Sequence, residues 1–223
     1  MKKLIFVLVL CITNLSFAQK VEKDLGDFTA LKTFDGLTVS LIKADYNKAI
    51  ISGEHASEVQ LINKDGLLKI RLEIDESYQG EDTFVTLYYK NLFVLDANEG
   101  SRIASDETLK AIDLELRTQE GAGINVAVDV KRLTVKAVSG SQIKVIGIAT
   151  NQDVTVNSGG MYKANKLETE QTVVTVSAGG NAKVNASELV KAKVRAGGNI
   201  RVYGDPKVID KKTVLGGTIT IVN

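Results

Sequence analysis

The stretches SGSQI (Ser139–Ile143) and SGGMY (Ser158–Tyr162) belong to a turn-like motif that occurs seven times in the second half of the chain. The other five copies are EGSRI (Glu99–Ile103), EGAGI (Glu120–Ile124), AGGNA (Ala178–Ala182), AGGNI (Ala196–Ile200) and LGGTI (Leu215–Ile219). Their leading glycines are Gly100, Gly121, Gly140, Gly159, Gly179, Gly197 and Gly216, which are 21, 19, 19, 20, 18 and 19 residues apart. A repeat of this length predicts a stacked fold in which each unit packs mainly on its two neighbours.

Apolar and polar residues alternate on both sides of each leading glycine. The third residue after it is apolar or aromatic in every copy: Ile103, Ile124, Ile143, Tyr162, Ala182, Ile200 and Ile219. The fourth residue before it is polar in every copy: Asp96, Arg117, Lys136, Thr155, Thr175, Lys193 and Lys212. Strict alternation predicts two strands per repeat, each with one buried and one solvated face. We expect the leading glycines to be structural corners, because glycine permits a positive φ and the close approach of the next layer.

Two all-β architectures are compatible with this pattern. In a parallel β-solenoid, or β-helix-like fold, each repeat is one rung of about 19 residues, and equivalent positions stack ~4.8 Å apart. In an antiparallel β-meander or sandwich, the same strands would pair through hairpins. The solenoid is favoured, since stacked corners explain why the same corner chemistry recurs at the same end of every repeat. In a meander each turn needs only to connect its own two strands, so nothing would require alternate turns to have the same sequence.

The first residues of the chain predict export. Lys2 and Lys3 precede an apolar run over 4–12, and Ser16-Phe-Ala18 supplies small residues at a cleavage site. This is the pattern of a secretory signal peptide over residues 1–18, and the run is too short for a transmembrane helix. Cys11, the only cysteine, lies within it. We expect a protein of the periplasm, the cell surface or the medium, with a less regular β region over 19–99 and the glycine-cornered repeats over 100–223 continuous with it.

The chain contains few residues suited to catalysis or metal binding. Its single histidine, His55, is accompanied only by Glu54 and Glu58, whereas zinc sites recruit several His or Cys ligands. We therefore expect His55 to be a solvated loop residue. Three pairs of adjacent carboxylates occur in turn-like contexts, where neighbouring side chains point apart: Asp75-Glu76, Glu81-Asp82 and Asp106-Glu107. No catalytic residue, metal or cofactor is predicted, and no nucleic-acid partner is expected.

A set of basic residues is the strongest candidate for a binding surface. Lys144, Lys163, Lys183 and Arg201 all stand four residues after a leading glycine. In a solenoid they would form a basic row on one face, and like charges at strand spacing are unfavourable unless a counter-ion relieves them. The hypothesis is that this row contacts an acidic glycan or another anionic polymer of the cell envelope. The alternative is that the lysines only keep the sheet soluble. The pattern leaves the oligomeric state open.

The assembled motifs resemble the head domain of putative auto-transporter adhesins, the GIN domain, a domain of unknown function in exported bacterial proteins. Phe34-Asp-Gly-Leu-Thr-Val39 resembles its opening strand, and Asp65-Gly-Leu-Leu-Lys-Ile70 the element that follows. The glycine corners resemble its serial corners, and Val202-Tyr-Gly-Asp-Pro206 its closing segment. The resemblance implies a right-handed β-solenoid-like protein of the periplasm or cell surface and brings no catalytic residues with it. We expect a non-catalytic adhesin or envelope glycan-binding module, with a structural or assembly protein as the alternative. An enzyme acting on polysaccharide is the least favoured reading.

Overall fold

The computed structural model describes residues 20–73 and 79–222. Within these residues the secondary structure consists of strands and turns, with no helix. The predicted signal peptide and the Asp75-Glu76 pair lie outside the described residues. The strands are β1 (Val21–Asp24), β2 (Ala30–Thr33), β3 (Thr38–Lys43), β4 (Lys48–Gly53), β5 (Val59–Lys64), β6 (Leu67–Leu72), β7 (Thr83–Tyr89), β8 (Val94–Ala97), β9 (Arg102–Thr118), β10 (Gly123–Ala137), β11 (Gln142–Val156), β12 (Met161–Ser177), β13 (Asn181–Asn185), β14 (Leu189–Arg195), β15 (Asn199–Tyr203), β16 (Val208–Val214) and β17 (Thr218–Ile221).

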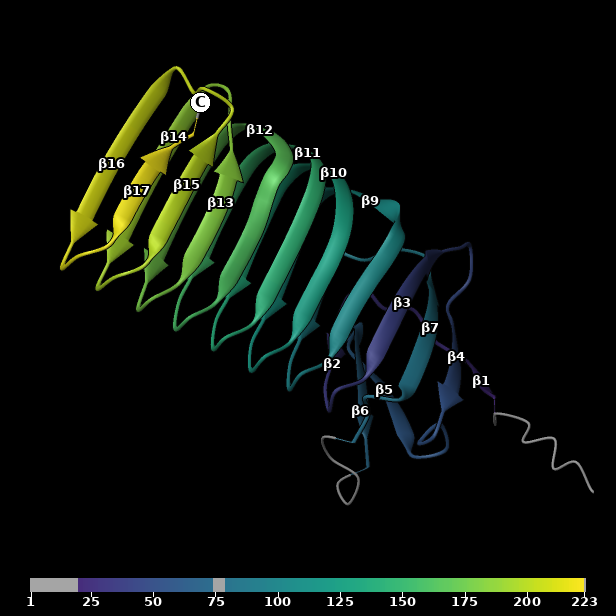
Figure 1. The fold of residues 1–223 in the computed structure, drawn as a ribbon. Coiled ribbons are helices and arrows are strands. Elements are labelled where there is room, and N and C mark those ends of the chain that lie inside the picture. The colour runs from purple at the N-terminus through teal and green to yellow at the C-terminus, as the bar shows by residue number, and fades with distance from the viewer. Residues whose placement is uncertain (1–19, 74–78, 223) are drawn as a thin grey trace, which may run out of the picture.

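The chain from β9 onward winds into a parallel β-solenoid (Figure 1). β10 pairs with β11 in parallel from Gly123↔Gln142 to Ala137↔Val156, so equivalent residues 19 positions apart lie side by side. β11 pairs with β12 in the same way, and β13, β15 and β17 continue the stack on one side while β14 and β16 continue it on the other. The solenoid prediction is therefore confirmed, and the antiparallel alternative is wrong for this part of the chain.

The leading glycines are corners of the coil, as predicted. At the corner Val138–Ser141, both central residues have positive φ (53° at Ser139 and 71° at Gly140), and the N–H of Ser141 donates to the carbonyl of Val138 at 3.2 Å. This is the pattern of a type I′ turn. The N–H of Gly140 donates to the carbonyl of Ser158 in the next corner at 3.1 Å. The corners thus stack through their own hydrogen bonds.

The second reason proposed for the leading glycines, close approach of the next layer, is wrong. A Cβ added at Gly140 would meet no atom within 4 Å, because the corner points into solvent. Crowding instead affects the following residue. A Cβ at Gly160 would lie 2.3 Å from the carbonyl oxygen of Ala137. The first glycine of the pair is therefore needed for its backbone conformation and the second for its lack of a side chain.

The expectation of two strands in every repeat is only partly correct. β9 to β12 are single strands of 15 to 17 residues that bend once between corners. Separate strands occur only in later coils, as β13 with β14 and β15 with β16. Local bulges absorb the variation in repeat length. The 21-residue spacing arises where Ser105, Asp106 and Glu107 lie opposite the single residue Val126.

The inward residues form a narrow core between two facing sheets. We call the sheet of strand segments that follow each corner the front sheet (β3, the first halves of β9 to β12, β13, β15 and β17) and the other the rear sheet. Ile124, Ile143 and Ile200 from the front sheet are 0–2% exposed, as are Leu116, Val135 and other residues from the rear sheet. This confirms the predicted alternation, which buries apolar surface worth about 25 cal/mol per Å².

One buried polar network interrupts this apolar core. The hydroxyl of Tyr162 donates to Gln152 Oε1 at 2.9 Å, and Gln152 Nε2 donates to Thr172 Oγ1 at 2.8 Å. The hydroxyls of Thr172 and Thr169 are 2.9 Å apart, and Thr169 donates to the carbonyl of Asn185 at 2.6 Å. The chain of donors therefore ends on the backbone. Burial raises the pKa of the Tyr162 phenol far above its ordinary value, so it remains a donor.

The first part of the chain caps the coil with antiparallel strands. β1 pairs with β4 and β4 with β7 in antiparallel fashion, and β5 and β6 form a hairpin. Asp35 and Gly36 have positive φ, and the N–H of Gly36 donates to the carbonyl of Glu99 at 2.8 Å. This is a further corner, stacked on the first predicted one. The coil thus extends into the less regular region.

The last coil carries a charged residue at an inward position. Lys211 lies in register with Ala192, which is 2% exposed, and the equivalent residues of earlier coils are buried leucines and valines. β16 has no further strand beside it among the described residues. An inward charge on an edge strand is a known protection against pairing with another chain.

Candidate functional site

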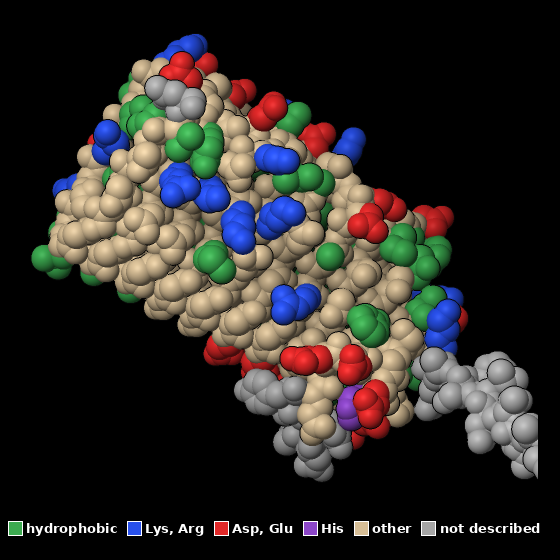
Figure 2. Space-filling view, viewed as in Figure 1, with side chains coloured by type: hydrophobic (Ala, Val, Ile, Leu, Met, Phe, Trp, Pro, Cys, Tyr) green, Lys and Arg blue, Asp and Glu red, His purple; other side chains and the backbone are tan. Residues whose placement is uncertain are grey.

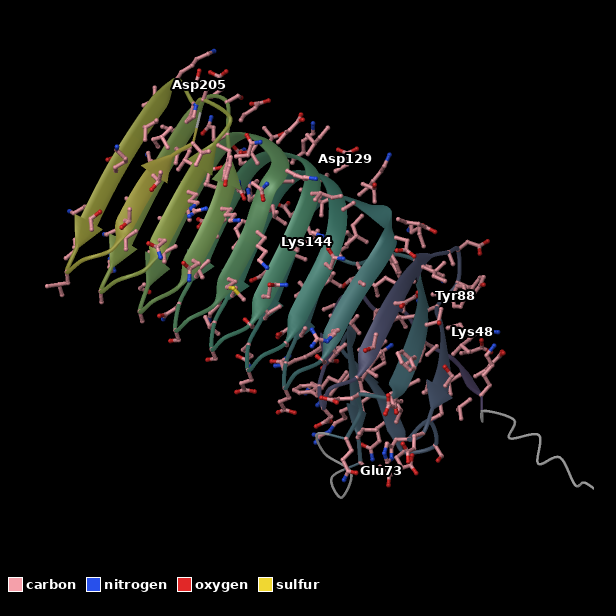
Figure 3. The ribbon with its side chains drawn as sticks, viewed as in Figure 1. Lys48, Glu73, Tyr88, Asp129, Lys144 and Asp205 are labelled. Atoms are coloured by element: carbon pink, nitrogen blue, oxygen red, sulfur yellow. The ribbon has the colours of Figure 1, made fainter. Side chains whose placement is uncertain are left out.

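The structure brings the four predicted basic residues together in one row across the front sheet. Lys144 pairs in register with Lys163, Lys163 with Lys183, and Lys183 with Arg201. All four side chains point away from the core, because the residues on either side of each point inward. Figure 3 labels Lys144 near the middle of the stack, on the front of β11. We call Lys144, Lys163, Lys183 and Arg201 the basic row.

The outward side chains beside the basic row include one further cation, Lys166, and no carboxylate. The outward neighbours on the corner side are Gln142, Met161, Asn181, Asn199 and Thr218, and those on the other side include Ile146, Lys166, Asn185 and Tyr203. None of these is acidic. Figure 2 shows blue side chains gathered on this face, with red ones along its upper edge and near the N-terminal corners. Asp129 and Asp205 are labelled at that upper edge in Figure 3.

The cations of the basic row make no ion pair with any described residue. Elsewhere on the described surface some lysines and arginines face carboxylates, as in Lys32–Asp96 at 3.5 Å and Arg132–Asp113 at 3.1 Å. In the basic row, by contrast, the polar contact of Lys163 is with the amide oxygen of Gln142 at 2.7 Å. The row is therefore a positive field that is not neutralised locally.

A shallow depression of about 420 Å³ lies at the C-terminal end of this field. Its lining residues are Asn181, Ala182, Lys183, Asn199, Arg201, Thr218 and Thr220. The side-chain amide of Asn199 donates to that of Asn181 at 2.9 Å across neighbouring coils. Amide, hydroxyl and cationic donors thus face the same hollow, which is suited to a ligand rich in oxygen acceptors.

A second set of basic residues, each four positions before a leading glycine, belongs to the rear sheet, and one of its members, Arg117, is paired with a carboxylate. Arg117, Lys136, Lys193 and Lys212 point away from the opposite side of the core. Arg117 Nε is 2.6 Å from Glu115 Oε1, and this hydrogen bond is the main cause that raises the pKa of Arg117. The two sets of cations therefore cannot engage one flat ligand together, and the rear set is partly neutralised.

The remaining sequence candidates that the structure describes are His55 and two of the carboxylate pairs. His55 lies in a turn, as expected, but it is not fully solvated, since its side chain is 19% exposed and its Nδ1 lies 3.8 Å from Glu58 Oε2. Among residues 20–73 and 79–222, no three His, Cys, Asp or Glu side chains gather as metal ligands would. Asp106 and Glu107 do not simply point apart, because both border one depression. The signal that could have located this depression is the 21-residue repeat, which marks the bulge.

Asp35 and Glu99 form an acidic contact at the first two corners that the sequence analysis missed. Asp35 is 1% exposed and its Oδ2 accepts the N–H of Leu72 at 3.0 Å. Burial raises the pKa of Glu99, and so do a hydrogen bond to the Asp35 side chain and the charges of Asp35 and Glu120, while Arg71 opposes them. The Asp-Gly and Glu-Gly turns were the available signal, since stacked corners bring their side chains together.

Among the described residues, the fold is a β-solenoid whose front sheet carries a row of cations without ion pairs. No helix in the described part of the chain is long and apolar enough to cross a membrane. The chain belongs to the family described as putative auto-transporter adhesin, head GIN domain, whose model matches residues 27–206. The family membership inferred from the corner motifs is thereby confirmed. No curated protein is significantly similar to the chain in sequence.

Solved structures share the fold at low sequence identity. A putative adhesin from Bacteroides fragilis aligns with a TM-score of 0.86 and 15% sequence identity. The alignment covers 93% of this chain and 98% of the adhesin chain. Putative adhesins from Parabacteroides distasonis and Parabacteroides merdae have TM-scores of 0.73 and 0.71 and identities of 20% and 18%. Each covers 92% of this chain and 96% of its own. At these identities the likeness concerns the fold alone.

Proposed function

We propose that this protein is an exported, non-catalytic binding protein of the cell envelope or cell surface that holds an anionic glycan, or a similar envelope polymer, on the basic row. The observation that carries the proposal is the basic row itself, four stacked cations without a carboxylate partner among the described residues. Membership in a family of putative adhesins supports a binding role rather than a catalytic one. Export rests on the signal-peptide pattern of residues 1–18.

The electrostatics of the basic row favour a polymer over a single small anion. Neighbouring strands are ~4.8 Å apart, and two unit charges at that separation repel by about 1 kcal/mol in water. Flexible lysine side chains spread to reduce this repulsion. A linear polyanion lying across the strands would contact successive cations and remove the repulsion along the whole row. Its binding would weaken as salt screens the charges.

A role in structural assembly is the second candidate. β16 and β17 have exposed edges, and Val208 and Leu215 at this end of the coil are 57% and 84% exposed. Such edges can pair with strands of another protein. However, Lys211 occupies an inward position of the last coil, and its charge would be costly to bury beneath the core of another molecule. The adhesin-like role is therefore preferred.

Charge removal from the basic row tests the proposed function. Lys144, Lys163 and Lys183 are replaced together by glutamine, and retention on an immobilised anionic polysaccharide is measured at two salt concentrations. We expect a large loss of retention at low salt and a weaker dependence on salt. The matched control replaces Lys136, Lys193 and Lys212 of the rear sheet by glutamine, which changes the net charge equally. Equal retention of the two variants would refute the assignment of the face.

A further inference from the structure

The front sheet carries a second hollow near its N-terminal end. This depression has a volume of about 270 Å³ and lies where β3, β7 and the bulge of β9 meet. It is lined by Ser40, Leu41, Ile42, Thr86, Ala104, Ser105, Asp106 and Glu107. Ser40 and Ala104 pair in register and precede Asn125 and Lys144 in the same outward row. The hollow therefore opens on the same face as the basic row.

The bulge in β9 makes one wall of this hollow. Pairing between β3 and β9 ends at Leu41↔Ser105, and the two extra residues of this coil carry Asp106 and Glu107 out of the sheet. Ser105 Oγ accepts the N–H of Glu107 at 3.2 Å and lies 3.4 Å from the carbonyl of Leu41, which fixes the shape of the bulge. Bulges commonly re-aim side chains beside binding sites. Neither Asp106 nor Glu107 forms an ion pair with a described residue.

On the side away from the bulge the hollow is lined by Thr86 of β7, and aromatic residues flank Thr86 along that strand. Phe84, Thr86 and Tyr88 are successive outward residues of β7, and Tyr88 lies directly beside Ile42 in the register. Phe84 is 49% exposed. The ring of Tyr46, itself 47% exposed, stacks on that of Tyr88 with centroids 5.5 Å apart. Figure 3 shows Tyr88 toward the N-terminal end of the stack, beyond Lys144. Large aromatic side chains exposed together on a small protein commonly mark a binding surface.

We propose that this hollow, which we call the junction site, binds one uncharged sugar ring of a glycan. The apolar C–H face of a pyranose ring can lie against Ile42 and the ring of Tyr88 beside it, as apolar faces do on tyrosine and phenylalanine. Its hydroxyl groups can donate to the carboxylates of Asp106 and Glu107 and exchange hydrogen bonds with Ser40 and Thr86. The negative charge of the wall excludes an acidic sugar. The junction site therefore takes a different sugar from the basic row.

The inference rests on the proposed function to the extent that both place a glycan on the front sheet, but the two sites have opposite charge. From β9 to β11 the row advances by two strands, so a single glycan chain with neutral and acidic segments could cover both. Neutral glycans alone should also bind, at the junction site only. That difference separates the two proposals experimentally.

The experiment measures binding of short neutral oligosaccharides of glucan, mannan and galactan to the full chain by titration calorimetry. For a binding sugar, Tyr88→Ala should weaken affinity by about fivefold, since an aromatic contact contributes roughly 1 kcal/mol. Tyr88→Phe should bind as the unaltered protein does, which shows that the ring and not the fold is responsible. Glu107→Ala should weaken affinity by about tenfold or more, because it removes a charged acceptor.

Two controls distinguish failure of this inference from failure of the proposed function. Tyr203→Ala removes an aromatic residue from the other end of the same face and should leave neutral-sugar binding unchanged. The triple glutamine variant of Lys144, Lys163 and Lys183 should also bind neutral sugars normally while losing retention on anionic polysaccharide. The inference is overturned if none of the three neutral oligosaccharides binds, or if Tyr88→Ala and Glu107→Ala bind them normally.

Discussion

Replacing Tyr162 by phenylalanine tests the importance of the buried polar network. The substitution keeps the ring and removes only the hydroxyl that donates to Gln152 Oε1 at 2.9 Å. Tyr162 is 1% and Gln152 2% exposed, so water cannot replace the lost donor without a change in packing. A buried acceptor left without its partner costs about 1–3 kcal/mol. For a protein of this size, that corresponds to a fall of about 2–12 °C in Tm.

The assay is urea unfolding followed by circular dichroism, with the slope m compared between variants. An unchanged m with a lower midpoint would locate the effect in stability rather than in compactness. Tyr203→Phe is the matched control, since Tyr203 lies on the outer face, and it should change stability by less than about 0.5 kcal/mol.

A double-mutant cycle sharpens this prediction. Gln152→Leu removes the acceptor, while Thr172 keeps its contact with Thr169 at 2.9 Å. In the double variant Tyr162→Phe/Gln152→Leu neither buried partner is left unpaired, so the loss should be smaller than the sum of the single losses by about 0.5–3 kcal/mol. If Tyr162→Phe is as stable as the unaltered protein, or if the two losses simply add, the reasoning about the network is refuted.

Two further predictions concern the coil end and the first corners. Lys211→Val places an apolar residue at the inward position beside Ala192 and should promote end-to-end association of the coil, measured by sedimentation velocity. Lys212→Val is the control, because residue 212 points outward. If Lys211→Val stays as monodisperse as this control, the role of Lys211 is contradicted. Burial and Asp35 raise the pKa of the Glu99 carboxyl in the folded protein above its ordinary value of 4.5. The folded protein therefore holds this proton more tightly than the unfolded chain does. The resulting stabilisation is lost as the pH rises through the folded-state pKa. Glu99→Gln should therefore gain stability relative to the unaltered protein at pH 7 and show little difference at pH 4, by urea midpoints; an equal difference at both pH values would exclude this contribution.

The corner motif and the alternation on its two sides were sufficient to assign the buried residues. Ile124, Ile143 and Ile200 are buried as expected, because a strand with period two must place every second side chain on one face. The positive φ at Gly140 and the outward position of Lys144 follow from the same local pattern. The family membership also followed from these short motifs, because their order and number are specific.

The sequence could not determine which strand lies beside which. Backbone donors and acceptors are the same in parallel and antiparallel pairing, so only the complete set of long-range contacts selects the solenoid. The same contacts place Arg117 and Lys144 on opposite sheets, bring the Asp35 corner onto the Glu99 corner, and turn a two-residue insertion into the wall of the junction site. The chain's own residues thus determined which side chains are buried and which are solvated. The tertiary structure alone decided which of the solvated ones meet, because residues distant in sequence become neighbours only when the coils stack.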